Sequence, residues 1–195
     1  AIHVIRQAGL KVTDVKWVFV KSAVVAANSF KSGSVDACVS WAPDVYQAAK
    51  AREGAKILSS TKTEKYLIAD ILIAKKAYIK KNMKAVKSFI KGWFKGVVAV
   101  NNDREAAVKL MTSKVSKGFT GVDLALAKIM LDAIYLPTYE ENVNFFNAAS
   151  EGEANYHSVY KKSEEIWKSI NKLTVSTEPG ISVMPELLQG MDINN

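Results

Sequence analysis

Six side chains in this sequence are candidates for contact with a small molecule, and their chemistry is that of a binding site. They are Ser22, Trp41, Pro43, Asp44, Tyr46 and Asp70. A serine that begins a helix lies beside free backbone N–H groups, which can hold an anion. An indole can form the apolar wall of a pocket, and a carboxylate can pair with the cationic part of a ligand. These residue types suit the recognition of a small solute.

Each candidate also has a purely structural interpretation, and the sequence leaves both open. Ser22 is equally an ordinary helix N-cap. Trp41 lines a pocket if it points into a cleft, and belongs to the core if it points onto a sheet. Asp44 is in the first turn of an expected helix, where acids often only interact with the helix dipole. Tyr46 could reach a cleft or simply be exposed. Asp70 interrupts an apolar run, so we expect a hinge group held by backbone amides or a ligand contact.

The chain has few residues suited to catalysis or metal binding. Its two histidines, His3 and His157, are far apart in the sequence, and Cys38 is its only cysteine. A single cysteine excludes an internal disulfide and a cysteine-based zinc site. We interpret Cys38 as a small buried hydrophobic residue, and we expect no catalytic residue, no metal and no cofactor.

Composition indicates a soluble, folded chain with a basic surface. The 195 residues are 49% hydrophobic and carry a formal net charge of +8. Apolar runs such as residues 68–74 are far shorter than the ~20 residues that cross a bilayer. Only Arg6, Arg52 and Arg104 are arginines, and the lysines are dispersed along the expected helices. Because proteins that bind nucleic acids favour arginine, we interpret the charge as a solvated surface and expect no nucleic-acid partner.

The first third of the chain predicts an alternation of helices and short strands. Hydrophobic spacing predicts helices over residues 1–9, 22–32 and 43–52, and strands over residues 15–20, 35–40 and 55–58. Gly33 and Gly54 suit the ends of two of these helices. Such alternation is typical of a parallel sheet with helices on its faces. Ligands bind at the carboxyl edge of such sheets, where Trp41 would lie.

The remainder of the chain is predicted to be mainly helical after one more strand over residues 67–74. Asn82 is expected to cap the clearest amphipathic helix, and Asp103 to Ser113 form the next. Capping boxes at residues 120–123 and 138–141 predict two more helices, and apolar spacing over residues 156–170 predicts a last long one. From Thr174 onward, Pro179, Gly180 and Pro185 predict an extended tail with a short turn at residues 186–189.

In order and spacing, these motifs resemble the solute-binding proteins of the nitrate, sulfonate and taurine (NMT1-like) type. Gly33, Val35-Asp36-Ala37, Trp41 and Pro43 match the pattern G-x-V-D-A followed by W-x-P. Residues 9–15 resemble the family's G-L-x-x-x-D-V entry to the preceding strand. Residues 68–73 look like the strand that crosses back to the first lobe, and residues 141–146 resemble a C-terminal segment of some members. The resemblance covers about residues 1–170.

The resemblance implies an α/β fold of the type II periplasmic-binding-protein kind, with parallel-rich sheets flanked by helices and a helix-rich C-terminal half. Residues 1–66 would then belong to the second lobe, incomplete at its N-terminal side. Residues 67–173 would return to the first lobe and be mainly helical, and residues 174–195 would form the extended tail. On this interpretation the N-terminal part of the first lobe lies outside this chain, which therefore contains one side of the cleft.

The function implied is that of the substrate-binding component of an ABC-type transporter. Such a protein captures a small anionic or zwitterionic solute between two lobes without catalysis and presents it to a membrane permease. Its location would be periplasmic or at the cell surface, although no secretory signal is visible in this chain. A ligand-sensing module of a larger protein is an alternative. A thiamine-pyrimidine-synthesis enzyme, as some relatives are, would need a histidine- and cysteine-rich site.

Overall fold

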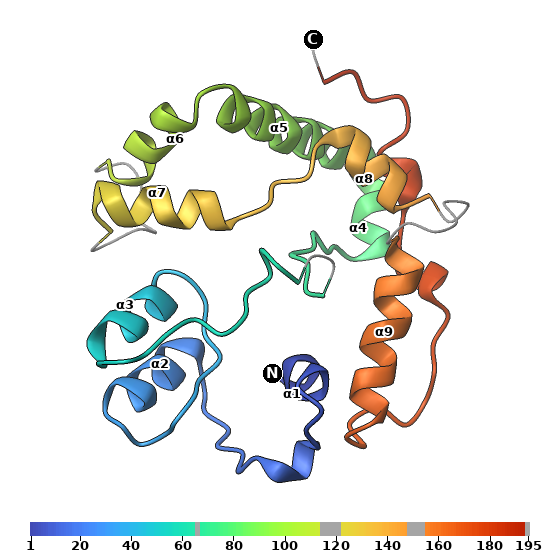
Figure 1. The fold of residues 1–195 in the computed structure, drawn as a ribbon. Helices are drawn as coiled ribbons and strands as arrows, with labels where there is room; N and C mark the ends of the chain where they lie inside the picture. Colours follow the sequence, from blue (N-terminus) through green and yellow to red (C-terminus); the bar gives the residue numbers. More distant parts are fainter. Residues whose placement is uncertain (65–66, 114–121, 148–154, 194–195) are drawn as a thin grey trace.

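The computed structural model describes residues 1–64, 67–113, 122–147 and 155–193, and in this part of the chain every regular element is a helix. The elements are α1 (Ile2–Gln7), η1 (Val12–Asp14), α2 (Ala23–Lys31), α3 (Asp44–Ala51), α4 (Lys76–Lys81), α5 (Met83–Asn102), α6 (Arg104–Met111), α7 (Leu124–Ala133), α8 (Tyr139–Phe145), α9 (Tyr156–Lys168), η3 (Pro179–Ser182) and η4 (Pro185–Leu187). Figure 1 shows α2, α3, α6 and α7 on the left, α4, α8 and α9 on the right and α5 along the top, so the chain crosses the view several times. None of the described helices is long and apolar enough to cross a membrane.

The expected α/β fold with parallel-rich sheets is wrong for the described residues. No β-strand forms in any of the four segments that were predicted as strands, residues 15–20, 35–40, 55–58 and 67–74. A strand requires backbone hydrogen bonds to a neighbouring strand. The described parts of these segments form no such ladder with one another. Their apolar pattern is therefore that of a strand, but their backbone lacks the partner that would make one.

The local signals for helix ends are largely confirmed. Ser22 Oγ accepts a hydrogen bond from the Val25 backbone N–H at 3.3 Å, and Gly33 has a φ of 77° just after α2. Asp103 caps α6, and Thr138 with Glu141 forms the expected capping box of α8.

Two cap predictions fail or cannot be followed. Asn82 occupies the N-cap position of α5, but its side chain donates instead to the Tyr78 carbonyl oxygen at 3.0 Å. At the start of α7 the cap is Asp123, and Thr120 of the expected capping box lies outside the described residues. Helix α4 directly precedes Asn82 and has no counterpart among the predicted elements.

Packing is divided among small clusters. Val122, Leu126 and Ala127 at α7 form a buried cluster, against which Tyr46 of α3 and Val108 of α6 pack. Along α5, Ile90, Phe94 and Val97 are buried, and Phe94 meets Tyr139 of α8 edge to face with ring centroids 5.5 Å apart. The tail reaches the same region, since the Tyr139 hydroxyl donates to the Leu188 carbonyl oxygen at 2.5 Å.

The surface of the molecule is large for its mass and rich in apolar side chains. Its accessible area is 14309 Å², whereas a compact 21.4 kDa monomer exposes about 9,100 Å². The excess includes the extended segments, where Phe19 is 86% and Ile73 is 79% exposed. The helices thus bury a modest core and leave the strand-like segments uncovered.

Candidate functional site

Helices α2 and α3 form a parallel pair, and this pair carries most of the predicted site residues. At one end, the Ser40 hydroxyl donates to the Ala23 carbonyl oxygen at 3.0 Å, which places the segment entering α3 against the start of α2. Between the ends, Ala27 and Ala48 are almost fully buried, so two small side chains allow close approach of the helices. The N-termini of both helices consequently lie at the same end.

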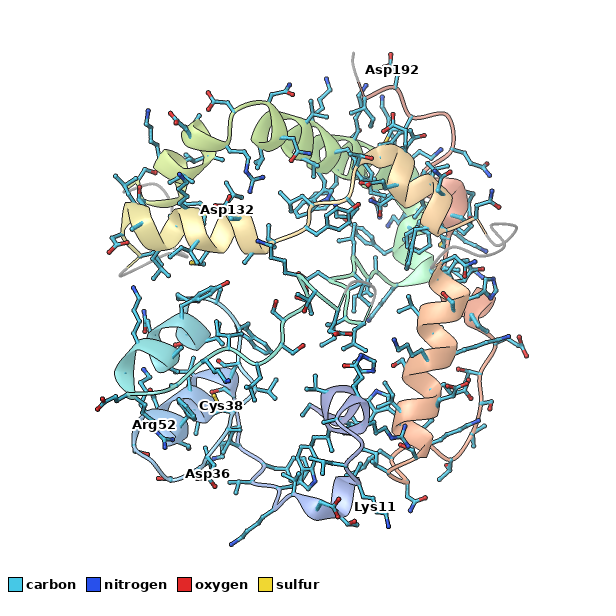
Figure 2. All side chains as sticks on the ribbon, in the orientation of Figure 1. Lys11, Asp36, Cys38, Arg52, Asp132 and Asp192 are labelled. Carbon is cyan, nitrogen blue, oxygen red and sulfur yellow. The ribbon has the colours of Figure 1, made fainter. Side chains whose placement is uncertain are left out.

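The other end of the pair is fastened by Arg52. Its Nη1 donates to the carbonyl oxygens of Phe30 at 3.1 Å and Val35 at 2.9 Å. The guanidinium carbon also lies 4.5 Å from the centre of the Phe30 ring, a cation–π contact. Figure 2 shows Arg52, Asp36 and Cys38 beside this helix pair. Arg52 therefore joins the end of α3, the end of α2 and the segment that follows α2.

The shared N-terminal end of the pair has the electrostatics of an anion site. A helix N-terminus carries a partial positive charge from its unsatisfied N–H groups. In α3 the N–H groups of Val45, Tyr46 and Gln47 already donate to the Trp41 and Pro43 carbonyl oxygens, and Asp44 lies in the first turn, so the positive potential comes mainly from the start of α2. Trp41 lies one turn before α3, where its carbonyl oxygen accepts from Val45, and its side chain is 70% exposed. An exposed indole next to two helix N-termini offers an apolar contact and partial positive charge to the same ligand.

The structure places the six predicted site residues in three different situations. Ser22, Trp41, Pro43 and Asp44 all belong to the N-terminal end of the α2–α3 pair. Ser22 is exposed and caps α2, so its structural role is seen directly, while Pro43 and Asp44 are half-buried at the start of α3. Their contact with a ligand stays a prediction.

Tyr46 and Asp70 lie apart from that group. The Tyr46 side chain packs on the buried cluster of Val122, Leu126 and Ala127, which gives it a packing role between α3 and α7. Asp70 is exposed in the extended segment that leads to α4. Among the described residues, no hydrogen bond or ion pair joins Asp70 to Ser22, Trp41 or Asp44. The burial that suggested a hinge or ligand role for Asp70 is absent in this arrangement.

Cys38 is half-buried in the segment between α2 and α3. Burial raises the pKa of its thiol above the ordinary value of 9.0, which favours the protonated form near neutral pH. The side chain is less buried than the core residue that the sequence predicted.

One polar contact was not foreseen from the sequence. His3 Nε2 of α1 lies 2.9 Å from Glu64 Oε2, and the Gln7 side-chain amide donates to the same oxygen at 3.4 Å. The contact joins α1 to the polar loop that ends at residue 64. The two partners are 61 residues apart, so no local spacing signals them. The second histidine, His157, stacks on Tyr156 with ring centroids 4.0 Å apart.

The described residues do not assemble a metal centre, since no three His, Cys, Asp or Glu side chains gather closely enough to hold an ion. The two histidines belong to α1 and α9 and make the separate contacts just described. The side chains at the N-terminal end of the α2–α3 pair are hydroxyl, indole and carboxylate groups. Their arrangement can bind a ligand by dipoles, apolar contact and ion pairing.

Comparison with known proteins identifies the family to which the chain belongs. A family model described as NMT1/THI5 like matches residues 2–107, which is more than half of the chain and includes the whole α2–α3 pair. The chain belongs to the NMT1/THI5-like family, whose members are mostly binding proteins and include enzymes of the THI5 type. The match confirms the resemblance seen in the Gly33–Pro43 motif. Neither the curated proteins nor the solved structures give a significant match.

Proposed function

We propose that this protein is the substrate-binding component of an ABC-type transporter and captures a small anionic or zwitterionic solute without catalysis. Membership of the NMT1/THI5-like family supports a solute-binding role. The observation that carries the choice of solute is the N-terminal end of the parallel pair α2–α3, where the start of α2 lies against the segment that bears the exposed Trp41. Partial positive charge at that point favours a negatively charged group on the ligand.

The binding residues act together at the N-terminal end of the pair. The N-terminal end of α2, with Ser22 at its start, holds the anionic group. Trp41 covers an apolar part of the solute, and Asp44 pairs with a cationic group where the solute is zwitterionic. Capture requires two lobes to enclose the solute, and on this proposal residues 1–66 belong to one lobe and residues 67–173 to the other. Binding shifts an equilibrium between open and closed states, and a membrane permease at the periplasmic or cell-surface side reads the closed state.

The test is a thermal-shift screen with a panel of defined solutes. Nitrate, taurine and other sulfonates, phosphonates and pyrimidines are added separately at millimolar concentration, and any hit is titrated by calorimetry. Trp41→Ala is expected to weaken binding of the hit by about tenfold or more, because an aromatic wall contributes strongly to ligand contact. Trp167→Ala is the matched control, since Trp167 is also exposed, at 51%, but belongs to α9.

Two outcomes contradict the proposal. One is the absence of a shift with every solute of the panel. The other is equal weakening by Trp41→Ala and Trp167→Ala, which would remove the α2–α3 pair as the site. Conversion of a bound pyrimidine, detected by mass spectrometry, would instead support an enzyme of the kind that the family includes. If the solute binds and its binding changes the activity of a domain attached to this chain, the result would support the alternative of a ligand-sensing module.

A further inference from the structure

Helix α5 and the short helix before it form the most strongly charged part of the chain. Between residues 75 and 95 there are eight lysines, and no aspartate or glutamate occurs from residue 71 to residue 102. The longest acid-free stretches elsewhere, residues 15–35 and 106–122, carry three lysines each. A segment of one charge sign attracts an anionic partner, and the effect is strongest where the lysines share one side of a helix.

The exposed side of α5 has three parallel rows of residues, which together we call the outer face. A lysine row consists of Lys84, Lys91 and Lys95, and an aromatic row consists of Phe89 and Trp93. Between them runs a row of small exposed residues, Ala85, Ser88, Gly92 and Gly96. These spacings place each row along one side of the helix, because an α-helix has 3.6 residues per turn. The buried residues Ile90, Phe94 and Val97 lie on the opposite side.

The two flanks of the outer face have different chemistry and are both accessible. Phe89 is 59% and Trp93 is 58% exposed, although both are large apolar side chains. Lys84 and Lys95 are exposed and Lys91 is half-buried. The tail touches the helix at Lys87, whose ammonium donates to the Gln189 carbonyl oxygen at 3.4 Å. Lys87 does not belong to any of the three rows, so the contact between Lys87 and the tail does not cover the outer face.

The small row determines the shape of the outer face. A Cβ added at Gly92 or Gly96 would meet no atom within 4 Å, so no neighbouring segment requires a glycine there. Glycine inside a helix is less favourable than alanine. Because the small row has no bulky side chains, a flat partner can approach the backbone of α5 closely. It can then touch the lysine row and the aromatic row at the same time.

We propose that the outer face of α5 docks on an anionic lipid surface. A helix with lysines on one flank and Trp or Phe on the other is the composition of interfacial helices, in which the ring enters the headgroup boundary and the ammonium groups meet lipid phosphates. The chain as a whole is positive at +8, which adds long-range attraction. Figure 1 places α5 at the margin of the molecule, where a planar surface can reach it.

Charge chemistry favours lipid over nucleic acid as the partner. No arginine lies between Arg52 and Arg104, so α4 and α5 have none of the forked donors that favour bidentate contact with phosphates and bases. Lysine acts as a point charge, which suits a diffuse anionic leaflet. This inference is independent of the solute-binding proposal, because α5 contributes none of the residues at the N-terminal end of the α2–α3 pair.

The first experiment is co-sedimentation of the whole chain with vesicles. Vesicles of phosphatidylcholine with 30% phosphatidylglycerol are expected to bind the protein at 50 mM NaCl, and vesicles of phosphatidylcholine alone are not. Each lysine near an anionic leaflet contributes a factor of about five, so the Lys84→Gln/Lys91→Gln/Lys95→Gln variant should bind about a hundredfold more weakly. The control Lys109→Gln/Lys128→Gln/Lys162→Gln has the same change in net charge on α6, α7 and α9, and should bind within about threefold of the unmodified protein.

A second pair of variants separates the outer face from general stability. Gly96→Glu introduces a negative charge into open space and favours the helix, so it should weaken vesicle binding about fivefold or more without lowering the melting temperature. Gly96→Gln gives the same helix gain without the charge, and because it only raises the profile of the small row it should weaken binding clearly less than Gly96→Glu. Brominated lipid should quench tryptophan emission of the unmodified protein, and Trp93→Phe should remove most of that quenching.

Several results would overturn the proposal. Equal losses in the two lysine triple variants would show attraction by total charge and no docking face. Binding to duplex DNA as tight as to the anionic vesicles, with the same lysine dependence and no quenching from Trp93, would identify nucleic acid as the partner. Vesicle binding unaffected by Gly96→Glu would place the contact elsewhere. Because the solute screen uses none of these variants, failure here leaves the solute-binding proposal to be judged separately.

Discussion

Arg52 should be the residue whose loss most disturbs the α2–α3 pair, and the change to examine is Arg52→Met. Methionine keeps an unbranched apolar stem but cannot donate a hydrogen bond. The variant therefore loses both bonds from Nη1, to the carbonyl oxygens of Phe30 and Val35, and the cation–π contact with the Phe30 ring. The Phe30 carbonyl oxygen near the end of α2 and the Val35 carbonyl oxygen in the segment after it both lose a charged partner.

The expected loss is about 2 kcal/mol in the free energy of unfolding. A hydrogen bond with a charged donor contributes about 1.5–3 kcal/mol, and a cation–π contact at an exposed site about 0.5–1 kcal/mol. Arg52 is half-buried and both bonds leave from one nitrogen, so we count them as a single charged bond at its lower value of about 1.5 kcal/mol and add about 0.5 kcal/mol for the cation–π contact. For a chain of this size, 2 kcal/mol corresponds to a fall of about 4–8 °C in the melting temperature.

Urea unfolding followed by circular dichroism at 222 nm measures the effect, with Arg6→Met as the matched control. Arg6 is exposed in the last turn of α1, so its variant should change the unfolding free energy by less than about 0.5 kcal/mol. A cycle with Phe30→Leu isolates the cation–π part, expected at about 0.5–1 kcal/mol. A loss below about 0.5 kcal/mol in Arg52→Met would refute the fastening role of Arg52, and with it the parallel alignment that brings the two N-termini together.

Three further predictions concern single positions. Gly33→Ala should lower stability by about 1 kcal/mol, because the φ of 77° disfavours an L side chain while the added Cβ meets nothing; Gly96→Ala, in regular helix, should instead raise it. Because burial raises the pKa of the Cys38 thiol, iodoacetamide should alkylate it several-fold more slowly than glutathione at pH 7.5, and labelling as fast as glutathione would contradict this. Hydrogen bonds from Lys168 and Ser176 lower the pKa of Glu164 below its ordinary value of 4.5, so its stabilising effect is fully present above pH 4.5 and is lost as the pH falls through the lowered pKa. The difference in urea midpoint between the unmodified protein and Glu164→Gln should therefore be clear at pH 7 and shrink as the pH is lowered below 4.5. A difference that does not change with pH would count against the ion pair.

The sequence predicted the helices well because their signals are local. Ser22, Gly33 and Thr138 each act within three residues of a helix end, by a side-chain oxygen or by a left-handed backbone. Asn82 shows the limit of this reasoning, since the same side chain could reach a carbonyl of the preceding helix and did so. Because α4 was not predicted from the sequence, its Tyr78 carbonyl oxygen could not be considered as a competing acceptor.

The strands were wrong for the opposite reason. Their apolar residues are those of buried strands, but a strand exists only through hydrogen bonds to another segment, and this pairing is not contained in the segment itself. Phe19 and Ile73 are among the most exposed large hydrophobic side chains of the molecule. A run of apolar residues thus predicts what a segment would do once it had a neighbour, and says nothing about whether the neighbour is present.

The candidate site was predictable in part. Features that depend on neighbouring residues could be predicted from the sequence, and those that depend on contacts between distant residues could not. Ser22, Trp41 and Asp44 were found because they lie next to predicted element ends. Their convergence depends on Ser40 bonding to Ala23, 17 residues away, and on Arg52 bonding to Phe30, 22 residues away. His3 and Glu64 are 61 residues apart, so no local sequence pattern could predict their contact.

The two proposed binding surfaces should respond differently to salt. The difference distinguishes a ligand held at hydrogen-bond distance from a partner attracted by exposed charges across water. At the N-terminal end of the α2–α3 pair, the ligand would meet N–H groups at hydrogen-bond distance, where mobile ions screen little. At the outer face of α5, exposed ammonium groups act across water on a charged leaflet, and the Debye length falls from about 10 Å at 0.1 M salt to about 3 Å at 1 M. Raising NaCl from 50 to 500 mM should therefore abolish vesicle binding while changing the affinity for the solute only several-fold. Equal salt dependence of both would mean that the solute is held by surface charge, and that the helix N-termini do not form its site.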